Sequence, residues 1–113
     1  MRVLFTLILF ISLSLPSYSQ LFNDGATIVV ESGAVLHVET DITNSNSGTI
    51  TNNGTIEVTG NFTNNATYNS NSATNSSIKF MGAGASSVTS NGAVFNNVTI
   101  EKTAAVDITL LDD

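Results

Sequence analysis

The chain has 113 residues, with nine acidic residues against three basic ones and a formal net charge of −6. This length gives room for one small domain, and so few basic residues cannot form the patch that nucleic-acid binding requires. The chain has no cysteine, which excludes disulfides, thiolate metal sites and attachment of a lipid to a cysteine.

Residues 1–19 have the layout of a secretory signal peptide. Arg2 precedes an apolar run over residues 3–15, and the small-x-small sequence SYS follows at 17–19. This order of charge, apolar run and small residues is typical of such peptides. The run is too short to cross about 30 Å of hydrocarbon. We therefore expect cleavage, export, and no stable membrane insertion of residues 20–113.

From residue 26 onward the sequence repeats in units of six residues. Residues 48–71 are GTITNN, GTIEVT, GNFTNN and ATYNSN, and residues 26–45 contain ATIVVE, AVLHVE and TDITNS, with SG inserted at 32–33 and NS at 46–47. Small or short residues hold the first place and apolar ones the third. Alternation within a unit is typical of a strand with one buried face. Asparagine and glycine at the junctions tolerate positive φ, so we expect the chain to bend there.

Three units form one coil of a solenoid, which makes residues 26–47 and 48–65 two successive coils. The predicted fold is all-β, a parallel β-helix or β-solenoid over residues 20–113 with the right-handed form favoured. Parallel strands about 4.8 Å apart place equivalent residues in columns. Asparagines at equivalent bends, such as Asn53 and Asn65, would form amide ladders on the outside. The predicted columns are Ile28–Ile50–Tyr68, Leu36–Ile56 and Ile42–Phe62.

The second half continues the alternation less strictly. Residues 78–80 place Ile78 and Phe80 inward, residues 82–87 read as a loop, and residues 95–102 place Val98 and Ile100 inward. We expect further strands of the stack with longer connections, and these connections leave a small β-sandwich as the alternative. Solenoids need polar caps, and none is visible at the last strand. We therefore expect a longer protein or a partner that covers this edge.

Two stretches, SGTITNNGTIEVTGNFTNN at 47–65 and IKFMGAGASSVTSNGAVFNNVTIEK at 78–102, resemble the β-solenoid repeat region of exported cell-surface, adhesin-like proteins of gliding-type Gram-negative bacteria. The resemblance implies a stalk or adhesin-type scaffold exported as a client of the type nine secretion machinery. Such proteins typically end in a C-terminal sorting domain, which these residues do not include, so the resemblance also suggests an N-terminal fragment. The residues that match in the second stretch are Phe80, Gly82, Gly84, Phe95, Asn96, Asn97, Val98 and Ile100.

Candidate catalytic residues are few. His37 is the only histidine, and in AVLHVE we expect it on the outward face of a strand, where it serves as a solvated surface residue. Glu31, Glu39 and Glu57 could supply the paired carboxylates of a glycosidase, but no lysine or arginine accompanies them within the repeats. A polysaccharide-acting β-helix is therefore the alternative to a non-enzymatic protein.

Metal and ice binding are also weakly indicated. Asp24 and Asp41 are hard oxygen ligands of the kind calcium prefers, without an Asp-x-Asp pattern around them. The sequence TIT at 49–51 is typical of ice-binding threonine ranks, but the equivalent places one coil on hold Thr67 and Asn69, which breaks the rank. We expect no catalytic, cofactor or metal site.

The sequence thus predicts a non-enzymatic, exported structural or adhesive β-solenoid segment of a cell-surface protein at the outer membrane. Its outward threonines and asparagines would hydrogen-bond cell-surface glycans or neighbouring solenoid segments. An ice-binding solenoid is the third interpretation.

Overall fold

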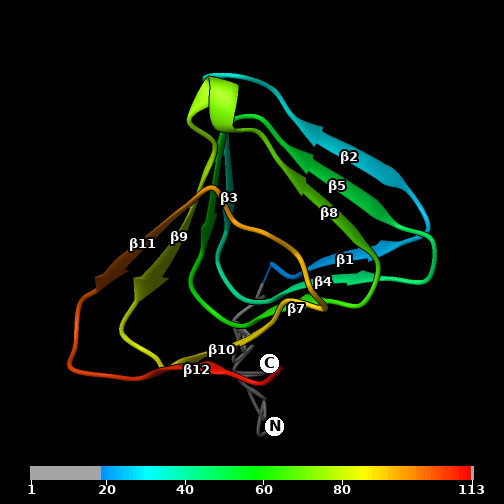
Figure 1. The fold of residues 1–113 in the computed structure, drawn as a ribbon. Helices are drawn as coiled ribbons and strands as arrows, with labels where there is room; N and C mark the ends of the chain where they lie inside the picture. Colours follow the sequence, from blue (N-terminus) through cyan, green and yellow to red (C-terminus); the bar gives the residue numbers. More distant parts are fainter. Residues whose placement is uncertain (1–18, 113) are drawn as a thin grey trace, which may run out of the picture.

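The computed structural model describes residues 19–112, so all but the last residue of the predicted signal peptide lies outside the described residues. The chain winds into a β-solenoid whose three parallel sheets form the sides of a roughly triangular outline (Figure 1). Within residues 19–112, no helix is long and apolar enough to span a bilayer.

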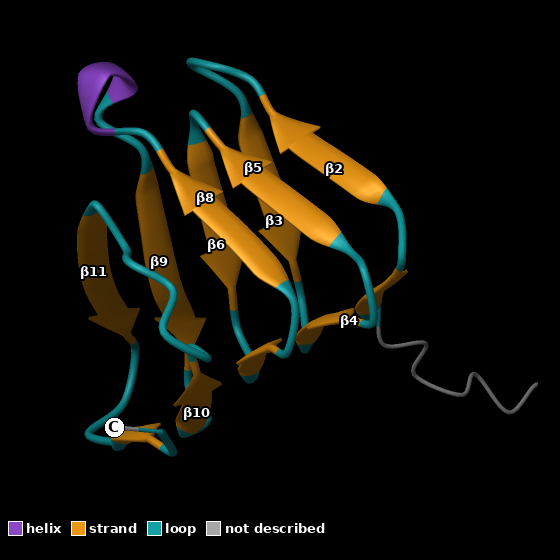
Figure 2. Cartoon of the chain, turned by 45° about the vertical axis from the view of Figure 1, so that its right-hand side comes forward, coloured by secondary structure: helices purple, strands orange, loops and turns teal. Residues whose placement is uncertain are grey.

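Each of the first three coils contributes one strand to each sheet, and the strands of a sheet stack in chain order (Figure 2). The first sheet contains β1 (Leu21–Asp24), β4 (Ile42–Ser45), β7 (Phe62–Asn64), β10 (Ser86–Thr89) and β12 (Ile108–Leu110). The second contains β2 (Thr27–Val30), β5 (Thr49–Asn52) and β8 (Thr67–Ser70). The third contains β3 (Val35–Val38), β6 (Thr55–Val58), β9 (Ser77–Gly82) and β11 (Asn97–Lys102), and one short 3-10 helix, η1 (Ser72–Thr74), joins β8 to β9. We call these sheets A, B and C.

The register confirms the predicted solenoid. Every strand pair between the described residues is parallel, so the β-sandwich alternative is wrong. Each six-residue unit forms one strand. The three predicted columns are present: Ile28 pairs with Ile50 and Ile50 with Tyr68, Leu36 pairs with Ile56, and Ile42 pairs with Phe62.

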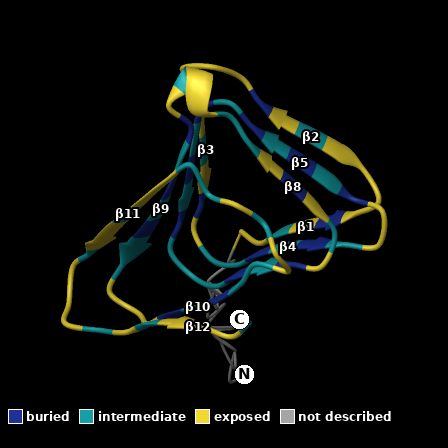
Figure 3. Cartoon of the chain, viewed as in Figure 1, coloured by how far each residue is buried: buried dark blue, intermediate teal, exposed yellow. Residues whose placement is uncertain are grey.

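The core runs along the solenoid axis. The inward side chains of the central coils are fully buried, as Ile50, Ile56 and Phe62 show at 0% exposure. Phe62 also packs edge-to-face against Tyr68 and against Phe95, with both pairs of ring centroids 5.5 Å apart. Exposed residues concentrate instead on β2, β11 and β12, at the two ends of the stack (Figure 3).

The central units begin with glycine because these positions have no space for a side chain. A Cβ added to Gly54 would lie 2.5 Å from the Glu31 carbonyl oxygen and closer still to that of Ala34. Gly48 and Gly60 face equally close oxygen atoms of Asn44 and Asp41. None of the three has a positive φ. The first place of these three units is therefore small because the preceding corner or coil passes directly beside it.

Each of the two inserted pairs contains a residue with positive φ. Gly33 has φ +79° and Asn46 has φ +54°, and both belong to the inserted pairs. The junctions of the central coil, such as Asn53-Gly54, turn without positive φ. The chain bends at these junctions, as expected, without using the positive φ that asparagine and glycine tolerate.

Four inward-pointing asparagines, here called the corner asparagines, stand where strands end: Asn23, Asn44, Asn52 and Asn64, each at most 2% exposed. The Asn44 amide nitrogen donates to Asn64 Oδ1 at 2.8 Å and to the Thr67 carbonyl at 2.9 Å, and Asn44 Oδ1 accepts from Asn23 Nδ2 at 2.8 Å. Asn52 donates to the buried Tyr68 hydroxyl and the Ser77 carbonyl, and accepts from the Gly54 amide. These bonds satisfy backbone groups that the bends turn inward.

The predicted outer ladder forms only in part. Asn71 Nδ2 donates to Asn53 Oδ1 at 3.1 Å, whereas Asn65 is exposed. The main ladder lies inside because Asn52 and Asn64, the residues directly before Asn53 and Asn65, fall on the inward side of the alternation.

The later strands agree with the prediction, with two differences. The loop predicted at 82–87 is shorter, because Gly82 ends β9 and Ser86 begins β10. Val98 and Ile100 are in register with the buried Ile78 and Phe80, but they are 53% and 59% exposed. They point inward at the end of the stack, where the sheet order places no strand beyond β11 among residues 19–112.

We predict that Asn44→Ala lowers the free energy of unfolding by about 2–4 kcal/mol, because it leaves several buried hydrogen-bonding groups without a partner. Chemical denaturation measures this change. The matched control is Asn65→Ala, which removes an exposed amide and should change the value by less than about 0.5 kcal/mol. Equal effects of the two substitutions would contradict a structural role for the inner ladder.

Candidate functional site

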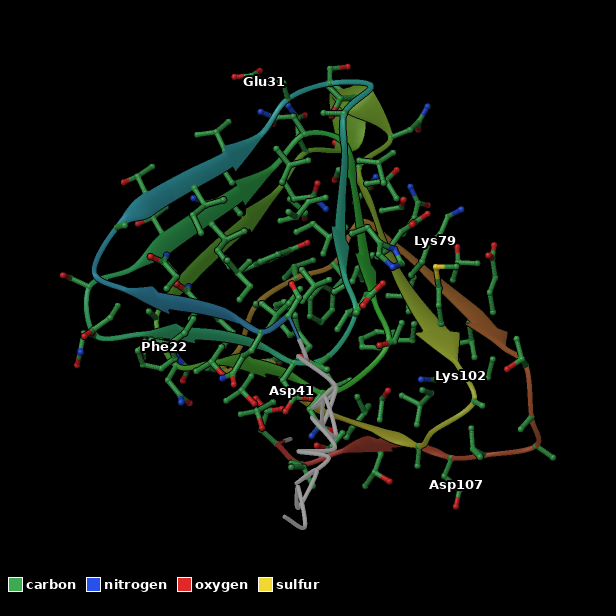
Figure 4. All side chains as sticks on the ribbon, turned by 180° about the vertical axis from the view of Figure 1, so that it is seen from behind. Phe22, Glu31, Asp41, Lys79, Lys102 and Asp107 are labelled. Atoms are coloured by element: carbon green, nitrogen blue, oxygen red, sulfur yellow. The ribbon has the colours of Figure 1, made fainter. Side chains whose placement is uncertain are left out.

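A column of ionisable residues runs along the outside of sheet C. The register places His37, Glu57 and Lys79 opposite one another on β3, β6 and β9. His37 Nδ1 lies 2.9 Å from Glu57 Oε2, and Lys79 Nζ lies 3.9 Å from Glu57 Oε1. Lys79 also lies 3.6 Å from Glu101 Oε1, on β11. Figure 4 shows Lys79 projecting outward from its strand.

The column adds a base that the six-residue units lack. No lysine or arginine lies within these units, but Lys79, from outside them, reaches Glu57. The predicted register could have found the pair, because a coil of three strands continues from Ile56 to Ile78 and therefore from Glu57 to Lys79.

The arrangement of the column favours charge pairing over catalysis. A nucleophile activated by His37 would need a hydroxyl bonded to its imidazole, and the described bond of the imidazole is to the Glu57 carboxylate. Thr55 and Ser77, on the same face, bond each other at 3.2 Å. With side-chain exposures of 20–47%, each ion pair contributes at most about 1 kcal/mol.

The other acidic candidates lie apart from Glu57. Glu31 follows β2 and Glu39 follows β3, and both are exposed. Continuing the registers places Glu31 beside Asn53 and Glu39 beside Thr59. The three glutamates therefore occupy three different columns, and the structure does not bring Glu31 and Glu57 together as a carboxylate pair.

The two aspartates considered as calcium ligands bind the protein itself. Asp24 Oδ1 accepts a hydrogen bond from Asn46, and Asp41 Oδ1 accepts from the Asn61 amide at 2.7 Å. Over residues 19–112, no group of three or more histidine, aspartate or glutamate side chains is arranged to hold a metal ion.

Hydroxyl columns cover the other two sheets. Thr27, Thr49 and Thr67 are in register on the outside of sheet B. Sheet A has an equivalent column of Thr43, Thr63 and Thr89. These six side chains are exposed or half-buried, so two sides of the solenoid present regularly spaced hydroxyl groups.

Beside the sheet B threonines runs a mixed column of Val29, Thr51 and Asn69. The TIT sequence suggests two threonine columns side by side. Only one of these columns is unbroken, as expected from Asn69 in the sequence.

Two charged residues that the sequence did not single out stabilise the last coil. Lys102 points into the angle between sheets C and A (Figure 4), where its ammonium donates to the carbonyls of Met81 at 2.6 Å and Thr59 at 3.2 Å and to Ser86 Oγ at 2.7 Å. Desolvation lowers the pKa of Lys102. Its role depends on the long β9 and β11 strands, which no six-residue unit predicts.

Asp112 holds the turn after β10. Its carboxylate accepts from the Ser90 amide at 2.7 Å, from the Ser90 hydroxyl at 3.0 Å and from the Asn91 amide. The bond from the Ser90 backbone is the largest cause that lowers the pKa of Asp112. Both residues therefore serve the fold, and neither forms part of a site open to a ligand.

Comparisons with protein-family models, with curated proteins and with solved structures found no match to this chain.

We predict that Asp112→Asn lowers the melting temperature near neutral pH but not in acid. Because the pKa of Asp112 is lower in the fold than in the unfolded chain, its ionised form stabilises the fold. This contribution is complete above the usual aspartate pKa of about 3.9, and it is lost as the pH falls through the lower pKa of the folded protein.

Thermal unfolding of wild type and variant over a pH series measures this difference. Asp107→Asn, which removes an exposed carboxyl that points away from the molecule (Figure 4), is the control and should show no such convergence. A constant difference between wild type and Asp112→Asn at all pH values would contradict the prediction.

Proposed function

We propose that this chain is a non-enzymatic β-solenoid segment that serves, after export, as a stalk or adhesive rod at the cell surface. The observation that carries the proposal is the division of polar groups between inside and outside. The corner asparagines, Lys102 and Asp112 bind backbone groups of the fold. Regular columns of hydroxyl groups remain on the outside of sheets A and B.

Export is supported by sequence features. Residues 1–19 have the layout of a signal peptide, and residues 47–65 and 78–102 resemble the repeat region of exported, adhesin-like proteins. The solenoid fold agrees with that resemblance and is also found in proteins of other functions.

Cell-surface glycans are the ligand class that the outer columns fit best. Threonine hydroxyls both donate and accept hydrogen bonds, as sugar hydroxyls do. Columns repeated along one side would bind a polymer at several points, so weak single contacts add up through multivalency. Neighbouring solenoid segments are the second partner of the proposal.

We expect the chain in its source cells to begin near Gln20 and to be accessible to protease added outside intact cells. N-terminal sequencing and protease shaving measure these two properties. Intact Met1 on a protein protected from the protease would contradict export.

For adhesion, we expect the purified chain to bind one or more immobilised surface polysaccharides, and the triple substitution of Thr27, Thr49 and Thr67 by valine to weaken binding at least about tenfold. Valine keeps the shape of threonine and removes its hydroxyl. The same substitution of Thr43, Thr63 and Thr89 on sheet A is the matched variant. Comparing the two variants shows which of the two faces binds the polysaccharide. Unchanged binding by both variants would contradict recognition through the hydroxyl columns.

A polysaccharide-acting enzyme is the main alternative, since His37, Glu57 and Lys79 lie together on sheet C. We expect no release of reducing sugars from acidic glycans by the wild-type chain. Release that Glu57→Gln abolishes, while Glu39→Gln leaves it unchanged, would overturn the non-enzymatic proposal.

An ice-binding solenoid is favoured by the unbroken threonine column of sheet B and disfavoured by its mixed neighbour. A thermal-hysteresis measurement separates the two, and we expect no hysteresis beyond the colligative effect.

A further inference from the structure

The last coil leaves the interior of the solenoid open. Val98, Ile100 and Leu110 are 53%, 59% and 71% exposed, although they stack on the buried Ile78, Phe80 and Val88. They line an apolar hollow of about 380 Å³. Among residues 19–112, β11 and β12 are edge strands, so their outer backbone groups can pair with further parallel strands.

The opposite end of the solenoid is apolar as well. Here β2 and β3 are the edge strands of sheets B and C, and Ile28, Val30 and Leu36 line a second hollow of about 270 Å³. Both ends therefore present apolar side chains together with unpaired strand edges.

The first and last strands of sheet A are equivalent. Their inward leucines, Leu21 and Leu110, begin and end one column that runs through Ile42, Phe62 and Val88. Two residues further on, Asn23 and Asp112 stand at the same corner, Asn23 against Asn44 and Asp112 against Ser90.

The last strand therefore matches the first in its inward leucine, Leu110 in the place of Leu21. At the corner it differs, because Asn23 donates to Asn44 whereas Asp112 accepts from Ser90.

We propose that the open end binds the first coil of a second copy of this chain, head to tail, with β12 replacing the β1 strand of that copy against its β4. Sheet A has five strands and sheet C has four, because the described chain after β11 adds β12 to sheet A and no further strand to sheet C. The β3 strand of the second copy therefore reaches β11 only when its β1 leaves. This step is feasible because β1 pairs with β4 alone and is joined to β2 through Gly25, at φ +88°.

The contacts on sheet C fit this arrangement. Continuing the register of the sheet places Leu36 and Val38 of the second copy over Val98 and Ile100. His37 of the second copy lies over Thr99, in the same diagonal relation to Glu101 that Lys79 has. The imidazole of the second copy would thus lie near Glu101 of the first copy, while it also lies near Glu57 of its own copy.

One like-charge contact accompanies this register, since Glu39 of the second copy falls over Glu101. This contact gives the register a test of its own.

The inference names the partner of the rod proposed above and in that sense rests on it, but it concerns the ends of the rod and not its sides. Head-to-tail contacts that do not close generate a filament, so the rod would lengthen without any change in the hydroxyl columns.

Disulfide trapping tests the polarity of the contact, since the chain has no cysteine of its own. Thr99→Cys and His37→Cys variants of the full chain are mixed under mild oxidation. Within one copy the two positions are three strand spacings apart, about 14 Å, too far for a disulfide, whereas in the proposed contact they are adjacent. We expect rapid cross-linking only in the mixture. Cross-linking of Thr99→Cys with itself alone, or none at all, would overturn the proposal.

Sedimentation over a concentration series tests the interface. We expect wild type to associate, and Ile100→Lys to raise the concentration for half-association at least about tenfold, because a lysine would be buried without a partner. Asn65→Lys, which adds the same charge at an exposed position of a central coil outside the hydroxyl columns, should have no effect. Glu39→Lys should lower that concentration, because it converts the like-charge contact into an attraction.

A chain that stays monomeric at all concentrations would overturn the inference and would indicate that other residues or another protein cover the open end. Protease shaving and glycan binding would still report on the surface role.

Leu21→Asp tests the strand replacement. If β1 must leave before the second copy binds, weakening its contact with Ile42 should promote association, even though it removes an apolar side chain. Weaker association of Leu21→Asp than of wild type would overturn the replacement.

Discussion

The fold depends on how each coil turns its corners. A corner rotates backbone N–H and C=O groups inward, where neither water nor a neighbouring strand satisfies them, and an unsatisfied buried group costs about 1–3 kcal/mol. A primary amide offers two donors and an acceptor oxygen, so Asn44 can bind the backbone and the asparagines above and below it. The close packing of corners also requires a small residue at the start of the next unit. Any Cβ at Gly54 would collide with the backbone of the preceding coil.

Much of the architecture follows from the sequence because side-chain alternation is a local property. The units between Gly48 and Asn71 contain no insertion, so their spacing alone sets the Ile50–Tyr68 contact. The Ile42–Phe62 contact spans the inserted pair at 46–47 and follows once that pair is placed between strands. The same alternation places Asn52 inward, two residues after Ile50, and an outer ladder was predicted only because asparagine was treated as a turn residue. The hydroxyl columns and the pairing of Glu57 with Lys79 also follow from the register.

The remaining features depend on contacts between coils that spacing does not encode. The space available at Gly48 and Gly60 is set by side chains of the preceding coil. Lys102 reaches the Ser86 hydroxyl across the corner between sheets C and A, and β1 pairs with β4 alone among the described strands. The exposure of Ile100 likewise depends on what lies beyond β11, and not on its own alternation.

The stacking of coils also determines how this protein would respond to mechanical force. Each strand pairs only with its counterparts in adjacent coils, so tension between the two termini would load the outermost strand first and peel it from its neighbour bond by bond. Yielding would proceed by single coils, each of roughly 20 residues and each releasing roughly 70 Å of extended chain. A protein of this kind would act under load as an extensible tether that lengthens in steps and dissipates energy before it detaches.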